Sequence, residues 1–168
     1  MQQFDLIIIG GGPGGYLCAE RAGKAGLRTA LLEKRALGGT CLNEGCIPTK
    51  SLLYCAKQYQ TMLHCEEYGI AAQNVSYDHA AAVVRKDGIV QTLVRGVGVS
   101  MKKHGVAVFS TEGKITGKTG DLFTVSAGAE SLFAPRLVLA SGSSAVVPPI
   151  PGVRDGLASG FVMTNREL

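Results

Sequence analysis

The sequence predicts an α/β fold built on a parallel β-sheet, and three features near its start carry that prediction. A short apolar run, residues 6–9, is followed by a glycine-rich cluster, residues 10–15. A stretch of helical composition, residues 16–24, then leads to a second apolar run, residues 28–32. Strand, helix and strand in this order form a βαβ unit, in which both strands lie parallel in one sheet.

Each part of this unit carries its own local pattern. Residues 6–9 are continuously apolar and mostly β-branched, as in a parallel strand that is covered on both faces. Alanines at positions 19, 22 and 25 would let the helix approach the sheet closely, and Gly26 marks its end. The second strand, residues 28–32, ends at Glu33.

The glycine cluster matches the fingerprint of a dinucleotide site. Gly10 permits a tight turn, Gly12 lets the backbone approach a pyrophosphate, and Gly15 lets the helix pack on the strand. The helix N-terminus adds free N–H groups for the phosphates. Glu33 follows about 20 residues later, where a carboxylate accepts hydrogen bonds from a ribose and repels a 2′-phosphate. A Gly-rich turn without a ligand is the alternative, but the flanking strand and helix favour a Rossmann-like site.

Two cysteines follow this unit within a short segment. Cys41 and Cys46 enclose Asn43 and Gly45, residue types that tolerate unusual backbone angles, so we expect a loop that brings the sulfurs together. Pro48 predicts the first turn of a helix that runs towards His64. Cys46 would then lie at a helix N-terminus, where the dipole stabilises a thiolate, and Lys50 would lie one turn further on.

Other interpretations of the cysteines remain open. Cys41 and Cys46 could form half of a zinc site with His64 and Cys65, although adjacent residues on a helix diverge and the spacing matches no common zinc pattern. A structural disulfide or two inert thiols is a further alternative. The remaining cysteines, at positions 18, 55 and 65, fall in helical patterns and are interpreted as small buried hydrophobes.

The rest of the chain predicts one long helix and a small β-meander. Residues 78–103 have a helical pattern, although Gly96 and Gly98 weaken its second half. Residues 106–109 predict a strand, and residues 114–115 and 122–125 predict a hairpin or meander. Prolines at 148, 149 and 151 and Gly152 indicate the end of the compact region and the start of a linker. We therefore expect a nucleotide-binding domain over residues 1–147 and a linker over residues 148–168.

Composition excludes several classes of protein. The chain has 168 residues, 46% of them hydrophobic and 18% charged, which is typical of an ordered domain. Its net charge of +4 comes from scattered lysines and arginines without interleaved aromatics, so we expect no nucleic-acid partner. No apolar run approaches the ~20 residues of a membrane helix. The first residues leave no room for a leader, so we expect a cytoplasmic protein.

The cysteine segment resembles a known family. Residues 38–50, Gly-Gly-Thr-Cys-Leu-Asn-Glu-Gly-Cys-Ile-Pro-Thr-Lys, resemble the active-site segment of the flavin-dependent pyridine nucleotide-disulfide oxidoreductases. Within that family, residues 47–52 are most similar to the dihydrolipoamide dehydrogenase branch, because glutathione and trypanothione reductases usually have a second lysine in place of Thr49. Residues 137–143 resemble the segment near the flavin phosphates, with Ser141 in place of the usual threonine. The likeness covers nearly the whole chain.

The resemblance implies a role for each site residue. Cys41 would be the interchange thiol that reacts with the dithiol substrate, Cys46 the charge-transfer thiol against the flavin, and Lys50 a cation near the flavin N5. Glu33 would bind the adenosine ribose. The residues expected to contact FAD are Gly10, Gly12, Pro13, Gly14, Gly15, Glu33, Lys34, Gly39, Thr40, Cys41, Cys46, Lys50, Gly113, Ser141 and Gly142.

The resemblance also implies a larger parent enzyme. Electrons would pass from the dihydrolipoyl group of an acyltransferase or lipoyl-carrier protein to the disulfide, then to FAD and to NAD. The sequence has no second dinucleotide fingerprint and no histidine in the family's catalytic context. We therefore expect the FAD-binding part of a multidomain homodimer, inactive alone and monomeric or weakly dimeric. A sibling disulfide or mercuric reductase, or a non-catalytic dinucleotide-binding module, is the alternative.

Overall fold

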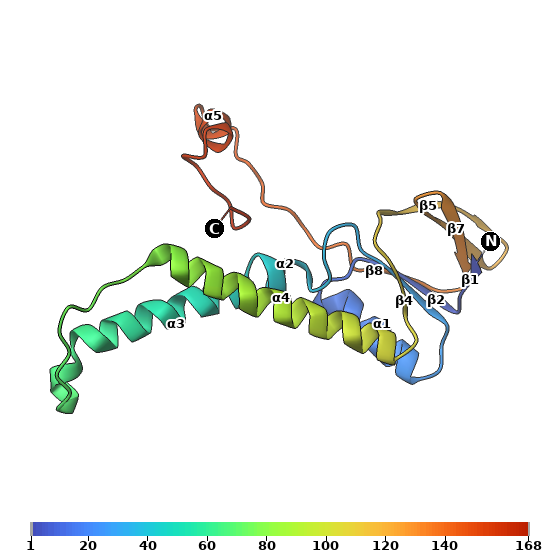
Figure 1. The fold of residues 1–168 in the computed structure, drawn as a ribbon. Helices are drawn as coiled ribbons and strands as arrows, with labels where there is room; N and C mark the ends of the chain where they lie inside the picture. The colour runs from blue at the N-terminus through green and yellow to red at the C-terminus, as the bar shows by residue number, and fades with distance from the viewer. Residues whose placement is uncertain (1, 168) are drawn as a thin grey trace.

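A four-stranded parallel sheet forms the centre of the protein (Figure 1). The computed structural model describes residues 2–167. The strand order is β4-β3-β2-β8, with bounds β2 (Leu6–Ile9), β3 (Thr29–Leu32), β4 (Ala107–Phe109) and β8 (Leu137–Leu139). In this register Ile8 of β2 lies between Leu31 of β3 and Val138 of β8. The parallel sheet predicted from the sequence is confirmed.

Helix α1 (Pro13–Lys24) connects β2 to β3 and completes the βαβ unit. It begins three residues before the predicted start at residue 16. Pro13 occupies the first helical turn, where its fixed φ suits a helix and its missing N–H costs nothing. Gly14 and Gly15 also lie in this first turn, although glycine has a low helix propensity. Gly26, at φ 81°, follows the helix end as predicted.

Two long helices form an arm that extends away from the sheet, and the C-terminal end of the second helix packs on the sheet through Met101 (Figure 1). They are α3 (Cys46–Leu63) and α4 (His79–Lys103), preceded by the short α2 (Gly39–Asn43) and connected through a 3-10 turn, Cys65–Tyr68. Asp78 caps α4 by accepting a hydrogen bond from the Ala81 amide at 3.1 Å. Arg85 of α4 donates to Ser51 of α3 at 3.2 Å. Both long helices agree with the predicted ranges.

A second sheet contains the β-meander. Its order is β1-β7-β6-β5, with bounds β1 (Gln2–Gln3), β5 (Gly113–Thr119), β6 (Leu122–Ala127) and β7 (Glu130–Ala134). Strands β5, β6 and β7 pair antiparallel in sequence order, as predicted for a meander. Strands β7 and β1 were not predicted from the sequence. Strand β1 has two residues and pairs with β7 at a distance of about 130 positions, so no local pattern marks it.

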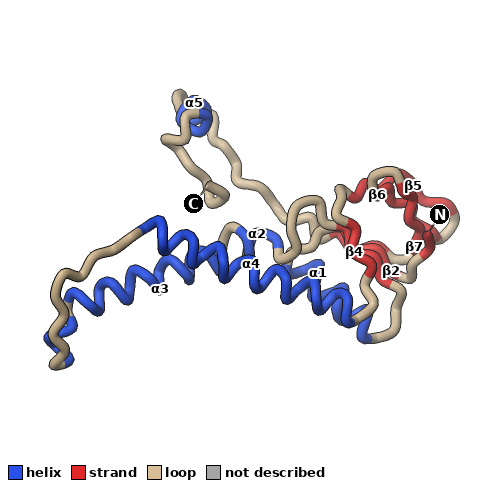
Figure 2. Tube along the Cα trace, viewed as in Figure 1, coloured by secondary structure: helices blue, strands red, loops and turns tan. Residues whose placement is uncertain are grey.

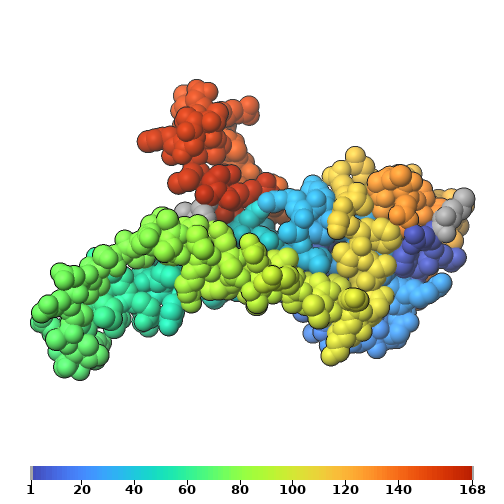
Figure 3. All heavy atoms as spheres, in the orientation of Figure 1, coloured from blue at the N-terminus to red at the C-terminus, as the bar shows by residue number. Residues whose placement is uncertain are grey.

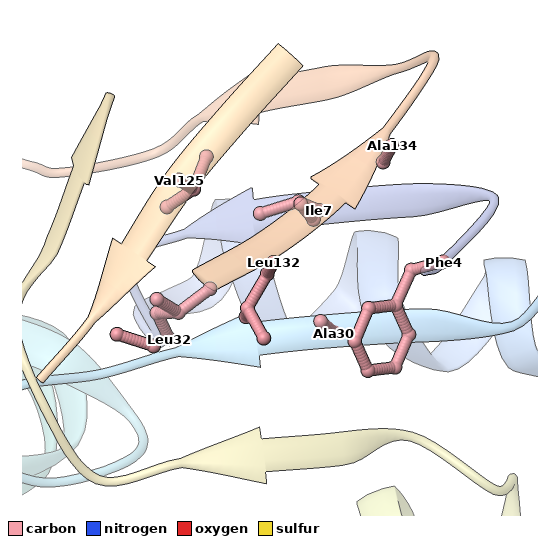
Figure 4. Packing of buried hydrophobic residues seen from close by; sticks show 8 residues of the cluster. Phe4, Ile7, Ala30, Leu32, Val125, Leu132 and Ala134 are labelled. Carbon is pink, nitrogen blue, oxygen red and sulfur yellow. The ribbon is translucent and has the colours of Figure 1, made fainter. Parts of the chain in front are cut away.

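Two buried clusters cover the two faces of the parallel sheet, since successive strand residues point to opposite faces. On one face Ile7, Ala30 and Leu32 pack against Val125 and Leu132 of the meander (Figure 4). On the other face the cluster combines strand residues with α1 and α4, and comprises Leu6, Ile8, Ala19, Ala22, Leu31, Met101 and Val106. The protein therefore has three layers, with helices, parallel sheet and meander stacked in that order. Figure 2 shows the helices and strands gathered at different ends of the molecule.

The chain leaves these layers after β8. Residues 141–152 are exposed and have no regular secondary structure. A short helix, α5 (Val153–Ala158), which was not predicted, follows them and stands apart from the layers (Figure 1). Over the described residues, 2–167, no helix is both long and apolar enough to cross a membrane.

Candidate functional site

A cavity of about 660 Å³ lies at the carboxyl ends of β2, β3 and β8. In an open parallel sheet this edge is where ligands bind, at the point where connections run to either side. Twelve of the fifteen predicted contact residues line it: Gly10, Gly12, Pro13, Gly14, Glu33, Lys34, Gly39, Thr40, Cys41, Gly113, Ser141 and Gly142. The remaining three, Gly15, Cys46 and Lys50, do not line this cavity.

Backbone packing requires glycine at two positions of the turn. Gly10 has φ 108°, and a Cβ there would lie 2.1 Å from the Ala140 carbonyl oxygen. A Cβ on Gly15 would lie 1.7 Å from the carbonyl oxygen of Gly10. The end of β2, the start of α1 and the segment after β8 are thus in contact through bare backbone. The first turn of α1 is held at the cavity by these contacts.

Gly12 and Gly14 differ, because the protein itself leaves room for a side chain. A Cβ on Gly12 would meet only the Gly39 Cα at 3.7 Å, and one on Gly14 would meet only the Ala140 Cβ at 3.8 Å. Both distances are ordinary van der Waals contacts. Both residues line the cavity at the N-terminus of α1, where backbone amides face an incoming anion. A bare backbone at this place fits the close approach of a dinucleotide pyrophosphate.

Glu33 lines the cavity at the end of β3, as predicted. Its Oε2 accepts a hydrogen bond from the Gly11 amide at 2.7 Å, and its Oε1 accepts from the Arg35 amide at 2.8 Å. Each carboxylate oxygen has a second lone pair, so the group can still accept hydrogen bonds from ribose hydroxyls. The Gly-rich turn and the acid therefore form one hydrogen-bonded unit. This donor and acceptor set fits an adenosine diphosphate moiety.

The structure brings the two cysteines together. Cys41 lies in α2 and lines the cavity, Cys46 is the first residue of α3, and the Cys46 side chain lies close enough to Cys41 to raise the pKa of its thiol. Both are free thiols. The loop expected between them is in part helical, because Asn43 ends α2 and its side chain donates to the carbonyls of Leu37 and Gly39 at 3.1 and 3.0 Å. The side chain of Asn43 thus stabilises α2, and the residue adopts no unusual backbone angle.

The pKa of the Cys41 thiol is raised above its ordinary value. The main cause is the hydrogen bond with the Cys46 side chain, followed by burial and by the negative charge that Cys46 carries when ionised. The positive charge of Lys50 acts in the opposite direction and lowers the pKa of Cys41. Cys41 thus keeps its proton to a higher pH than an isolated cysteine. Cys46 is exposed at the positive end of the α3 dipole, the position predicted from the sequence.

Replacing Lys50 by glutamine is expected to shift the reaction of Cys41 with a neutral alkylating reagent to higher pH. Only the thiolate reacts, and the change removes the positive charge of Lys50, which lowers the pKa of Cys41 and so favours the thiolate. The measurement is the alkylation rate of the Cys41 peptide against pH, followed by mass spectrometry. Lys57→Gln, about two turns further along the same helix, is the matched control and should leave the profile in place. An unchanged profile in Lys50→Gln would mean that Lys50 does not act on this thiol.

The cavity also contains charged residues that the sequence analysis did not assign to it. Arg35, Glu44, Glu112 and Arg166 all line it. Glu44 lies between the two cysteines, yet its side chain is only 8% exposed and contacts Arg35 and Arg166. In the sequence, these four residues cannot be distinguished from the other charged residues of the surface. The contact between Glu44 and Arg166 spans 122 positions, so no local pattern could reveal it.

The zinc alternative is not supported by the arrangement of the helices. Helix α3 has 18 residues and so spans roughly 27 Å at 1.5 Å per residue. Cys46 is at its first residue, whereas His64 and Cys65 follow its last. Within residues 2–167, no three His, Cys, Asp or Glu side chains gather in a way that could hold a metal ion.

Comparison with known sequences gives a consistent set of relatives. Residues 4–167 match the sequence profile of the family described as pyridine nucleotide-disulphide oxidoreductase. The dihydrolipoyl dehydrogenase of Acholeplasma laidlawii is 44% identical over 168 residues, which are 99% of this chain and 49% of that protein. That of Pseudomonas aeruginosa is 44% identical over 150 residues, 87% of this chain and 32% of the relative. The chain thus spans about a third to a half of the relatives it matches.

Solved structures show the same fold. LpdA from Mycobacterium tuberculosis matches 89% of this chain and 33% of its own, with a TM-score of 0.80 and 18% identity. The flavoprotein disulfide reductase RclA from Escherichia coli, solved as a Cu(II) complex, matches 90% of this chain and 31% of its own, with a TM-score of 0.72 and 27% identity. The similarity to these two solved structures confirms the fold predicted from the sequence.

Proposed function

Because the chain belongs to the pyridine nucleotide-disulphide oxidoreductase family, we propose that it is the FAD-binding, dithiol-bearing part of a dihydrolipoamide dehydrogenase. One observation carries the proposal: Cys41 lines the dinucleotide cavity, and the Cys46 side chain lies close enough to raise the pKa of the Cys41 thiol. A cofactor site and a closable dithiol are thus adjacent. The identity of 44% to two dihydrolipoyl dehydrogenases supports the choice of lipoyl groups as substrate.

FAD would be held through its adenosine diphosphate half. The first-turn amides of α1 and the bare backbone of Gly12 and Gly14 would receive the pyrophosphate. Glu33 would accept hydrogen bonds from the adenosine ribose, and its charge selects against a 2′-phosphate. The side chains of Lys34, Thr40 and Ser141 and the backbone of Gly39, Gly113 and Gly142 complete the lining. When bound, FAD supplies the group that accepts an electron pair from the dithiol and, in the complete enzyme, passes it to NAD.

The two cysteines would exchange a disulfide with the substrate. In the oxidised protein a dihydrolipoyl thiolate attacks the sulfur of Cys41 in the Cys41–Cys46 disulfide and releases Cys46 as a thiolate. The second substrate sulfur then attacks the first, which releases Cys41. The substrate leaves as a cyclic disulfide, and the protein holds two reduced sulfurs and the electron pair. Cys46 lies at the positive end of the α3 dipole, the raised pKa of Cys41 keeps its proton in place, and Lys50 supplies a nearby positive charge.

The proposal extends to the organisation of the parent protein. Residues 1–147 would form the first segment of the FAD-binding domain, and residues 148–168 would lead towards an NAD-binding domain. The partner would be the dihydrolipoyl group of an acyltransferase or lipoyl-carrier protein, in a homodimeric parent in the cytoplasm. The exposed, irregular residues 141–152 support a connecting role for this part of the chain.

Titration of the protein with FAD tests the proposed function, and Glu33→Gln is the informative variant. The change removes the charge that strengthens hydrogen bonds to the ribose and to the Gly11 amide, so we expect FAD to bind roughly tenfold or more weakly. Flavin fluorescence reports the bound fraction. Glu130→Gln is the control, because Glu130 is exposed in the meander and pairs with Gln2. Equal affinity of Glu33→Gln and wild type would contradict the assigned ribose contact, and absence of FAD binding by wild type would contradict the function proposed for these residues.

A further inference from the structure

Glu44 is an unusual carboxylate because two guanidinium groups from distant segments converge on it. Arg35 pairs with its Oε1, and Arg166 Nε donates to its Oε2 at 3.2 Å. The Glu44 side chain is 8% exposed, while those of Arg35 and Arg166 are 53% and 42% exposed. A carboxylate this well covered interacts more strongly with its partners than an exposed ion pair does. Glu44 also lies between Cys41 and Cys46, so whatever holds Glu44 acts on the cysteine segment.

The C-terminal tail, residues 144–167, is attached to the rest of the protein through this residue. Asn165 Nδ2 donates to the Glu44 carbonyl at 3.1 Å, next to the Arg166 contact. Within residues 2–167, the hydrogen bonds and the ion pair from the tail to the rest of the chain all end on Glu44. In Figure 3 the end of the tail, in red, lies near the cyan part of the chain. The tail is therefore held at one point, beside the cavity.

The tail end is shaped for this contact. Glu167 Oε2 accepts hydrogen bonds from the Thr164 amide and hydroxyl, both at 2.6 Å, which closes a tight turn around Asn165 and Arg166. The same two hydrogen bonds lower the pKa of Glu167 below its ordinary value. The turn presents both side chains to Glu44. Such a local preorganisation reduces the entropy lost when the tail is held.

The opposite side of Glu44 leads directly to the nucleotide site. The guanidinium of Arg35 binds Glu44, and the amide of Arg35 donates to Glu33, which in turn accepts from the Gly11 amide. Charge-assisted hydrogen bonds at both ends of Arg35, from its guanidinium and from its backbone amide, thus connect the tail to the turn that would hold the pyrophosphate. Glu33, Arg35, Glu44 and Arg166 all line the cavity.

We propose that Arg35, Glu44 and Arg166 form a latch that holds the tail beside the dinucleotide cavity and slows the release of the bound dinucleotide. The inference rests on the proposed function in taking FAD as that dinucleotide. Arg166 and Glu44 are positioning residues: they hold the tail end and the segment between the cysteines in place. Opening the latch frees the tail end and removes Arg166 from the lining of the cavity, so the dinucleotide leaves faster.

The test is the rate of FAD release from the loaded protein, followed as the return of flavin fluorescence after dilution. Arg166→Gln should accelerate release roughly threefold to tenfold, between the effects of exposed and buried ion pairs. Arg35 still pairs with Glu44 in this variant, so the fold is retained. Arg154→Gln is the matched control, since it removes the same charge from the same tail at a position with no contact to Glu44. Arg166→Lys, which keeps the charge, should restore part of the slow release.

A double-mutant cycle identifies the pair. Glu44→Gln should also accelerate the release of FAD. The double variant Glu44→Gln with Arg166→Gln should release FAD no faster than the faster single variant, because each change removes the same Arg166–Glu44 interaction. Release from Arg166→Gln at the wild-type rate, or full additivity in the double variant, would overturn the latch.

Hydrogen exchange at residues 164–167 provides a readout that does not need FAD. In the protein without cofactor, the amide of Thr164 should exchange several-fold faster in Arg166→Gln than in wild type or Arg154→Gln. Equal exchange in all three proteins would overturn the latch as well. If wild type binds no FAD but the exchange differs as expected, the latch stands and the proposed cofactor is wrong; if wild type binds FAD and neither readout responds, the latch is wrong and the proposed function stands.

Discussion

Replacing Gly15 by alanine is expected to destabilise the protein by roughly 3 kcal/mol or more and to abolish FAD binding. A Cβ at this position would lie 1.7 Å from the Gly10 carbonyl oxygen, which is backbone and has no rotamer to change. The helix would have to move away from the turn, and the first-turn amides would leave the cavity. The free energy of unfolding in urea and the FAD affinity are the two measurements.

Gly14→Ala is the matched control for stability. The neighbouring glycine also lies in the first turn of α1, but its Cβ would meet only the Ala140 Cβ at 3.8 Å. Alanine is the better helix former, so we expect this variant to be as stable as wild type or more stable by about 0.5–1 kcal/mol. If Gly15→Ala unfolds at the same urea concentration as wild type, the close contact between Gly10 and Gly15 does not exist in solution.

The second large effect is expected from Cys41→Ser and Cys46→Ser. The side chains of these cysteines lie close enough for Cys46 to raise the pKa of Cys41, so in the wild type they can close an intramolecular disulfide while an oxidised lipoyl group is reduced. Either serine leaves one sulfur, which can form only a mixed disulfide. After treatment with oxidised lipoamide, mass spectrometry should detect in the wild type a protein that is lighter by two hydrogens, because the disulfide has closed. We expect this product to be absent from both serine variants.

Cys55→Ser controls for the loss of a thiol in general. Cys55 lies in α3, more than two turns beyond Cys46, and should leave the reaction unchanged. Disulfide formation that persists in Cys41→Ser or Cys46→Ser, or that disappears in Cys55→Ser, would contradict the assignment of the redox pair. A protein that binds FAD equally well with either serine and has no dithiol reactivity in any form would be a non-catalytic binding module.

The elements that the sequence predicted well are those with strong local patterns. The apolar run at residues 6–9 predicts β2, and the alanine-rich segment predicts α1. The glycine turn between them predicts the position of the cavity. Cys46 at the start of α3 follows from Pro48 in the same way, because proline favours a first helical turn. Helix α4 persists through Gly96 and Gly98 because packing outweighs their low propensity.

Features formed by distant residues could not be predicted. Strand β1 is assigned only by its pairing with β7, and neither has a distinctive period. Glu44 resembles any surface acid until the fold places Arg35 and Arg166 beside it. Helix α2 is stabilised by two hydrogen bonds from the Asn43 side chain to the carbonyls of Leu37 and Gly39, which no local sequence pattern reveals.

The central claim is that a dinucleotide cavity and a redox dithiol act together, and the visible spectrum of the FAD-loaded protein during anaerobic titration with a dithiol tests it most directly. We expect flavin absorption bands and, on reduction of the Cys41–Cys46 disulfide, a new long-wavelength charge-transfer band from the Cys46 thiolate against the flavin. The band should be absent in Cys46→Ser. A flavin spectrum that is simply bleached by the dithiol, without that band in the wild type, would mean that the thiol does not face the cofactor and would contradict the claim.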